Sequence, residues 1–305
     1  MVFRYEYSGG VWVDLEQPHE DEIRQVAQEF SISERIEMEL LSPTPTPLVA
    51  SDEGMGLLVL HFPAHDEKNG GAGSQEIDFI VGKHFIVTVR YEVVAPLHHL
   101  KKLLETQKLV AGRASLTTDV LLEILFAHLY TSVRDHTNHV ASQLELVERD
   151  MFDGHERTTV RAISNVSREF LHMEAALANQ EEPLNRFLKS LRERGSFGIS
   201  FSERTGRIVA ERTQVARLIE THRAMATELR QTNLALLEAR QNEIMKTLTT
   251  INFIFLPLGL ISWIFAMRTE GMPLVDSPNA FWIVLAIMLG VAVFLITFFV
   301  KKRWL

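Results

Sequence analysis

The strongest pattern in the chain is a pair of long uncharged stretches near its C-terminal end. Residues 247–267 and 280–300 contain no charged side chain. As a helix, each would be about 31 Å long at ~1.5 Å per residue, which matches the hydrocarbon core of a bilayer. Neither stretch has a polar stripe wide enough to face water, as a surface helix of a soluble domain would. The pattern therefore predicts two membrane spans.

The short connection between these stretches makes them neighbours. Residues 268–279 contain Gly271, Pro273 and Pro278 and are too few to fold alone, so the two helices must be antiparallel. Three basic residues, Lys301 to Arg303, follow the second stretch, whereas the connection has a single arginine. By the positive-inside rule the C-terminus is cytoplasmic, and two spans place the N-terminal part there too. We expect an inner (plasma) membrane protein without a signal peptide, because the N-terminal sequence has no apolar run.

The first 95 residues alternate between strand and helix signals. Residues 11–15 alternate like a strand, and two helical patterns follow after Pro18, up to the proline-rich residues 42–48. Residues 55–63 and 77–92 are rich in β-branched and aromatic side chains, and the second run is expected to fold back at Gly82 and Lys83 as a hairpin. The acidic, glycine-rich residues 66–76 between them are expected to form a loop. We therefore predict a cytoplasmic α/β domain over residues 1–95.

From Pro96 to the membrane the chain has helical patterns. A short helix is expected at residues 100–109 and long helices at 116–152 and 158–193. Ser202 can cap a last helix, and nothing between Thr205 and Pro257 except Gly206 would break it, so it could run through the first span. The predicted fold is thus an α+β cytoplasmic domain, then long stalk helices over residues 96–245, then a transmembrane domain of two C-terminal helices over residues 246–305.

One face of the last helix carries polar and small residues into the first span. Asn252 is the informative member, because an amide in hydrocarbon is costly unless it meets a partner or a water-filled cavity. It either bonds a neighbouring helix or faces a pore. Two spans cannot enclose an aqueous path, so a pore requires several copies around the same face. The face recurs in heptad-like steps: Asn242, Met245, Thr249, Asn252, Leu256, Gly259 and Trp263.

Composition removes several other classes of function. The chain has no cysteine, which excludes disulfides and thiolate metal ligands, and its formal charge of −8 argues against nucleic acid as a partner. No set of nucleophile, base and orienting residue stands out, so we do not expect an enzyme. His128, Asp135, His136 and His139, the pair His98 and His99, and His61 with His65 have spacings that could bind metal, but a solvated face is the more typical explanation.

The sequence resembles a known transporter family along its whole length. QNEIMKTLTTINFIFLPLGLISWIF, followed by a short connection with MP, is similar to the pore helix of CorA-type metal transporters and their ZntB relatives. WVDLEQPHEDEI, DFIVGKHFIVTVRY, EGMP and KKRWL extend the likeness. The resemblance implies a homopentameric funnel that passes a divalent cation, Mg²⁺ or Zn²⁺, as cargo and holds no cofactor. It places Asn242, Met245, Leu248, Asn252, Leu256 and Gly259 on the pore, with Met245 and Leu248 at the hydrophobic constriction.

The outer mouth departs from this family. The signature at the end of the first span is Gly-Met-Asn, and here the aligned residues are Ala266, Met267 and Arg268. A ring of guanidiniums would repel an entering dication by about 4 kcal/mol per unit-charge pair at ~4 Å and an effective dielectric near 20. Glu270 and Asp276 would offset this charge, and Arg268 would alternatively snorkel to the interface as an anchor. The competing hypothesis is a non-conducting, CorA-like membrane scaffold or metal sensor.

Overall fold

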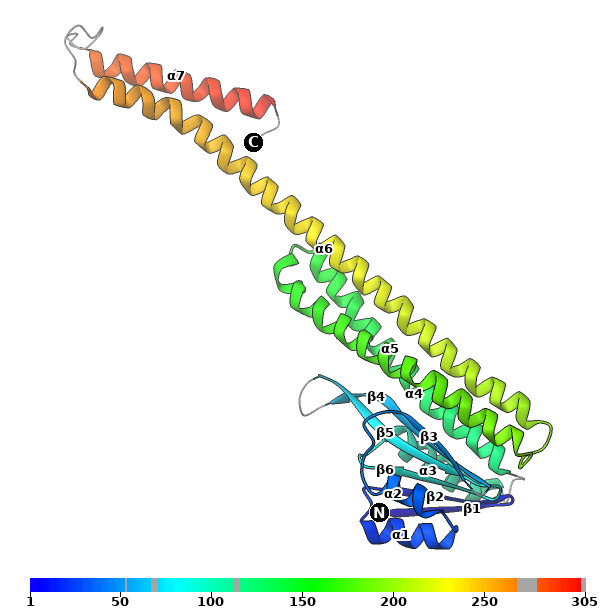
Figure 1. The fold of residues 1–305 in the computed structure, drawn as a ribbon. Helices are drawn as coiled ribbons and strands as arrows, with labels where there is room; N and C mark the ends of the chain where they lie inside the picture. The colour runs from blue at the N-terminus through cyan, green and yellow to red at the C-terminus, as the bar shows by residue number, and fades with distance from the viewer. Residues whose placement is uncertain (53, 67–70, 112–115, 268–278, 303–305) are drawn as a thin grey trace. The chain divides into compact units, whose positions relative to one another are not determined.

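The structure is a computed structural model that describes residues 1–52, 54–66, 71–111, 116–267 and 279–302 (Figure 1). The chain divides into two compact units, Met1–Arg230 and Gln231–Leu305, here called the first and the second unit. The predicted boundary at residues 95 and 96 lies inside the first unit, where strands give way to helices. The predicted boundary at residues 245 and 246 lies inside the second unit.

The first unit contains a mixed six-stranded sheet. Its order is β1-β2-β6-β5-β4-β3; β2 and β6 pair in parallel, and the other neighbours pair antiparallel. β5 and β6 form the hairpin expected at Gly82 and Lys83, where the Gly82 amide donates to the Phe85 carbonyl at 3.0 Å. The strands are β1 (Val2–Tyr7), β2 (Gly10–Glu16), β3 (Leu48–Asp52), β4 (Met55–Asp66), β5 (Gly71–Val81) and β6 (Phe85–Arg90).

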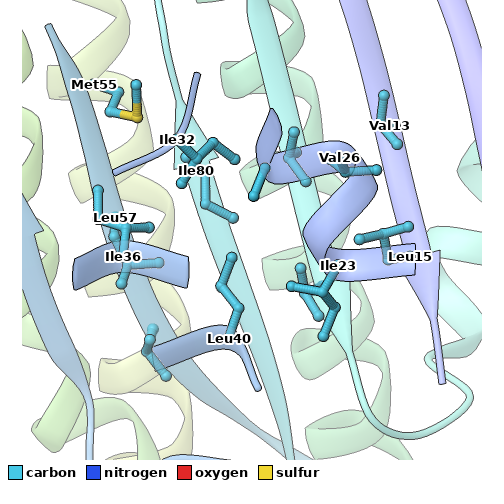
Figure 2. Packing of buried hydrophobic residues seen from close by; sticks show 14 residues of the cluster. Val13, Leu15, Ile23, Val26, Ile32, Ile36, Leu40, Met55, Leu57 and Ile80 are labelled. Carbon is cyan, nitrogen blue, oxygen red and sulfur yellow. The ribbon is translucent and has the colours of Figure 1, made fainter. Parts of the chain in front are cut away.

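Two short helices cover one face of this sheet. They are α1 (Glu20–Glu29) and α2 (Glu34–Leu40). Alternate residues of β2, including Val13 and Leu15, pack against Ile23, Val26 and Ile36 of these helices (Figure 2). The polar residues on the outer sides of both helices remain in water, so the amphipathic pattern of the sequence determines which face each helix buries.

Three longer helices cover the other face: α3 (Ala95–Ala111), α4 (Thr118–Phe152) and α5 (Glu156–Glu193) (Figure 1). The rings of Phe79 in β5 and Phe126 in α4 stack with centroids 5.0 Å apart, and Phe62 lies 5.8 Å from Tyr130. Because helices cover both faces, the central strands are apolar on both sides, which explains continuous runs such as residues 57–60 in β4.

The part of α6 (Phe201–Ala266) that belongs to the first unit is held to α4 and α5 by charged side chains. Arg204 pairs with Asp119 at 2.8 Å and with Glu123 at the same distance. Arg212 is buried and donates to the Leu177 carbonyl at 2.7 Å. Guanidinium groups suit these sites because their planar donors satisfy two acceptors at once. The long helices expected from the sequence therefore form a bundle within the first unit.

In the second unit, the end of α6 packs alongside α7 (Ala280–Lys301) (Figure 1). The rings of Phe253 and Phe299 lie 6.3 Å apart, and the Ser262 hydroxyl is 3.6 Å from the Met288 sulfur. Both helices are long and apolar enough to cross a membrane, and only 6% of the most apolar window of each is buried. Helices of a soluble core would be mostly buried. The exposure of these two apolar helices therefore agrees with the two predicted spans.

Several local expectations need correction. Residues 66–76 are not simply a loop, because β4 continues to Asp66 and β5 begins at Gly71, with these two residues in register; backbone pairing outweighs the low strand propensity of glycine. The expected helix 100–109 is longer and starts at Ala95, since Pro96 is tolerated in a first helical turn. The edge strands β1 and β3 were not predicted; their half-buried residues give only a weak alternating signal.

Candidate functional site

Within the second unit, α6 has a covered face and an open face. The covered face consists of half-buried or buried residues that recur at helical spacing: Thr250, Ile254, Pro257, Leu258, Ile261 and Phe265. At ~100° per residue these positions lie about 120–180° around the helix from Asn252. The contacts with Phe299 and Met288 flank this face, so α7 covers the side of α6 that faces away from Asn252.

The predicted pore-lining residues lie on the open face. At ~100° per residue they all fall within about 80° of Asn252. Asn252 itself is exposed, whereas Thr249 and Gly259 are half-buried. A Cβ atom built on Gly259 has no heavy atom within 4 Å, so no neighbouring element of the described chain crowds this position. The exposed members are Asn242, Met245, Leu248, Asn252, Leu256 and Trp263.

The threonines at the start of the first span bond to their own helix. The Thr249 hydroxyl donates to the Met245 carbonyl at 2.7 Å, and Thr250 donates to Lys246 at 2.9 Å. A hydroxyl that gives its proton to the backbone keeps acceptor lone pairs on its oxygen. Thr249 therefore presents an acceptor beside Asn252, one turn away, and the two side chains can offer oxygen to a hydrated cation.

Met245 and Leu248 are apolar residues on the same face. Their side chains are 54% and 53% exposed in the single chain. Exposed side chains of this size lose water contact when copies of the face meet, and a ring of them is the kind of constriction that stops ions by excluding water. The structure therefore places an apolar pair about one turn before the oxygen-bearing pair Thr249 and Asn252.

The predicted outer mouth is described only in part. Ala266 is the last residue of α6, and the exposed Met267 follows it. Arg268, Glu270 and Asp276 lie outside the described residues.

Three of the histidines whose spacing could suit a metal, His61, His136 and His139, have other partners. His139 contacts the Gln143 amide at 3.1 Å, and His136 pairs with Glu169 at the same distance. His61 contacts the Thr44 carbonyl at 2.8 Å. Among the described residues, no three His, Asp or Glu side chains gather in a way that could hold a metal ion. The histidine spacing therefore does not make a three-ligand centre.

A buried charge cluster in the first unit is not apparent from the sequence. Asp14 is fully buried and accepts from Thr88 at 2.6 Å and from Arg90 at 3.0 Å, and it also pairs with Lys101 of α3. Asp14 is the fourth residue of the alternating run VWVDL, so its position on a strand was predicted. Its two cationic partners come from distant segments, and no signal in a single sequence joins them.

A second buried group surrounds Asp78. Burial, followed by the negative charge of Glu76, raises the pKa of the Asp78 carboxyl well above its ordinary value. Glu76 accepts the Thr44 amide through both of its oxygens, at 2.8 and 2.9 Å, and the Tyr91 hydroxyl donates to the Leu40 carbonyl at 2.9 Å. These bonds anchor the proline-rich segment after α2 to the sheet.

Comparison with known proteins identifies the family. The family described as CorA-like Mg²⁺ transporter protein matches residues 7–303. The chain belongs to this family. The cobalt/magnesium transport protein CorA of Methanocaldococcus jannaschii is 22% identical over 304 residues, which is 97% of this chain and 91% of that protein. The protein of the same description from Thermotoga maritima is 24% identical over 297 residues, covering 96% of this chain and 83% of the relative.

Solved structures in this family share the fold. The complete structure of the CorA magnesium transporter from Methanocaldococcus jannaschii has a TM-score of 0.81 at 20% identity and covers 99% of this chain and 94% of that chain. The cytoplasmic domain of ZntB from Vibrio parahaemolyticus has a TM-score of 0.61 at 13% identity, covering 76% and 89%. The predicted α+β domain, long helices and two C-terminal apolar helices are thereby confirmed as the fold of this chain.

Proposed function

We propose that this chain is a divalent cation transporter of the Mg²⁺ or Zn²⁺ class, in which several copies of α6 surround the ion pathway. The observation that carries the proposal is the separation of the two faces of α6. α7 covers one face, and the opposite face presents Asn252 and Thr249, with no neighbouring element of the described chain crowding Gly259. Membership of the CorA-like family, whose description names Mg²⁺ transport, supports the same function.

The chemistry of the open face fits a hydrated dication. Mg²⁺ gives up its water reluctantly and is commonly held by oxygen groups that touch its hydration shell. An amide oxygen at Asn252 and a hydroxyl oxygen at Thr249, repeated around a symmetric assembly, form such rings. Met245 and Leu248 then act as the gate, because a narrow apolar ring sheds water and blocks ions until it widens.

An oligomer is required because one chain supplies two spans. Two helices pack against each other and leave no enclosed path, so the pathway must lie between copies around a symmetry axis. We propose a homopentamer in the inner membrane with both termini in the cytoplasm. Lys301 and Lys302 after the second span favour this orientation. Mass measurement of the detergent-solubilised protein tests the number of copies.

Ion flux into liposomes tests the proposed function. The purified full-length protein is reconstituted around a dye that reports divalent ions, and Mg²⁺, Zn²⁺, Co²⁺ and Ni²⁺ are added in turn, with empty liposomes as the control. We expect flux of at least one of these ions down its gradient. No flux of any of them under an inward or an outward gradient would overturn the proposal.

A second candidate function is a non-conducting scaffold or metal sensor with the same fold. The observation that favours it is the sequence Ala266, Met267 and Arg268 in place of Gly-Met-Asn. Replacing Arg268→Asn discriminates between the two. If the variant conducts and the parent protein does not, the scaffold is the better description. Equal flux through both means that an arginine at this position is compatible with transport.

A further inference from the structure

A cavity in the first unit lies between the facing sides of α3 and α4. Its volume is about 620 Å³. Residues three or four apart on α3 and on α4 line it, which is the spacing of one helix face. The lining residues with polar side chains are His99, Lys102 and Thr106 from α3 and His128, Thr131, Ser132 and Asp135 from α4. This cavity is separate from the open face of α6 in the second unit.

Two imidazoles face this cavity from opposite helices. His99 is exposed and His128 is half-buried, and both line the same space. Both helices therefore present an imidazole to one space, and the lone pair on a neutral imidazole nitrogen is what a transition metal binds.

One cationic and one anionic side chain, Lys102 and Asp135, line the cavity together with the two imidazoles. Lys102 disfavours a dication in the cavity, and Asp135 offsets this with its carboxylate. Asp135 lies two turns from His128 along α4, so a metal held by the imidazoles meets it through water. The hydroxyls of Thr131 and Ser132 lie between these positions and can accept from such waters.

We propose that His99 and His128 form a two-imidazole binding site for a transition-metal dication of the Zn²⁺, Co²⁺ or Ni²⁺ class in the cavity between α3 and α4. Imidazole nitrogen suits these ions and is a poor ligand for Mg²⁺, which prefers oxygen. Waters complete the coordination, since no three His, Asp or Glu side chains of the described residues gather in a way that could hold a metal ion. A bound metal bridges α3 to α4.

The site has a structural consequence within the first unit. α3 also carries Lys101, whose ammonium pairs with the buried Asp14 of β2. A metal that ties α3 to α4 therefore also holds the Lys101 contact with the sheet. Because a ligand that binds the folded state alone stabilises it by mass action, occupancy raises the thermal midpoint of unfolding. The site and its effect do not depend on whether the chain conducts ions.

The test uses the full-length, tag-free protein in detergent, titrated with Co²⁺ and followed by absorption and by thermal unfolding. We expect His99→Gln or His128→Gln to weaken binding about tenfold or more and to remove the rise in the midpoint, since loss of even a supporting partner costs that much at metal sites. His98→Gln is the matched control: His98 is the exposed neighbour on α3 and does not line the cavity. It should bind Co²⁺ like the parent protein.

Three outcomes would overturn the proposal. The first is unchanged Co²⁺ binding in both variants, and the second is an equal loss in His98→Gln. The third is competition by Mg²⁺ as strong as by Zn²⁺, which would mean oxygen ligands. If inorganic phosphate, and not a metal, raises the midpoint through His99, the cavity is an anion site and the proposal is wrong.

A second measurement uses the unmodified chain and does not rely on variants that fold. Diethyl pyrocarbonate modifies accessible imidazoles, and the modified peptides are counted by mass spectrometry. We expect Zn²⁺ to slow the modification of His99 and His128 and to leave His98 unchanged. Equal rates with and without Zn²⁺ at His99 and His128 would contradict the site. Ion flux plays no part in either experiment, so a failure here leaves the transport proposal untouched, and the reverse also holds.

Discussion

Asn252 and Thr250 point to opposite sides of α6: Asn252 is exposed, and Thr250 is completely buried on the side that α7 covers. Two residues apart on a helix are separated by about 200° at ~100° per residue, so one of them must face away from any partner that the other meets. Within the described part of the chain, the side chain that faces away from α7 is the amide. This relationship is the geometric basis for the proposed ion pathway.

Replacing Asn252→Leu is expected to reduce divalent-ion flux about tenfold or more. Hydrogen bonds to charged groups are worth about 1.5–3 kcal/mol, and ~1.4 kcal/mol corresponds to a factor of ten. Asn252→Gln keeps an amide on the same face and should retain more flux. The measurement is liposome flux at matched protein density, with the oligomer mass checked for each variant. If the Asn252→Leu variant conducts as fast as the parent protein, Asn252 does not line the ion pathway.

Gly259 and Gly290 provide a matched pair of substitutions. A Cβ atom added at either glycine meets nothing within 4 Å in the described chain, so Gly259→Ile and Gly290→Ile should fold equally well. Gly259 lies on the open face of α6, where a larger side chain narrows the proposed pathway. We expect Gly259→Ile to lower flux about tenfold or more and Gly290→Ile, on α7, to leave it within about twofold. If both substitutions lower flux by the same factor, the open face of α6 does not line the pathway.

A polar residue at Leu248 is expected to open the apolar constriction. Leu248→Ser makes the ring wider and easier to wet, so basal flux should rise at least severalfold. Ile251→Ser is the control, because Ile251 is also exposed and lies about 100° from Asn252 at ~100° per residue. Basal flux into liposomes is the readout. A rise of the same size in both variants would indicate a general loosening of the span.

The buried Asp78 is expected to make stability fall as pH rises. Burial and Glu76 raise the pKa of Asp78, and Tyr91 and Glu39 also face it. The folded protein therefore keeps this proton at pH values where the unfolded chain has lost it. Its favourable contribution is full below the ordinary pKa of 3.8 and is lost as pH rises toward the folded value. Asp78→Asn removes this dependence, so its thermal midpoint should exceed that of the parent increasingly with pH.

Glu29→Gln is the control for that pH series, because the contribution of Glu29 to stability changes with pH in the opposite direction to that of Asp78. The hydrogen bond from Arg4 lowers the pKa of Glu29. Its contribution to stability is present above the ordinary pKa of 4.5 and fades as pH falls through the lower folded value. The substitution should therefore lower the thermal midpoint slightly near neutral pH and not in acid. A pH-independent difference for Asp78→Asn would contradict the assignment of a proton to Asp78.

Removing Asp14 should strongly destabilise the first unit. Asp14→Ala leaves the guanidinium of Arg90 and the ammonium of Lys101 buried without their shared partner. Breaking one side of a buried ion pair typically costs about 3–5 kcal/mol in the free energy of unfolding. Glu16 also contacts Arg90, and its side chain is 21% exposed. Glu16→Gln should therefore lower the free energy of unfolding much less. Chemical unfolding of the two variants measures the difference, and equal costs would contradict the central role of Asp14.

The sequence by itself determined the elements whose signal is local. The two uncharged stretches, the long helices and the hairpin at Gly82 were predictable because hydrophobic periodicity and length act within one segment. The order of residues on the open face of α6 follows from helical spacing alone. The heptad-like steps therefore place Met245, Asn252 and Leu256 on one side of the helix without any knowledge of its neighbours.

The tertiary structure decided everything that depends on which distant segments meet. α7 could have covered either side of α6, because both sides carry large apolar residues, and only the packing shows that the side opposite Asn252 is buried. The Asp14 cluster with Arg90 and Lys101 and the cavity that His99 and His128 both line each join residues far apart in the chain. Their energies come from burial and charge in three dimensions, which no local pattern in one sequence records.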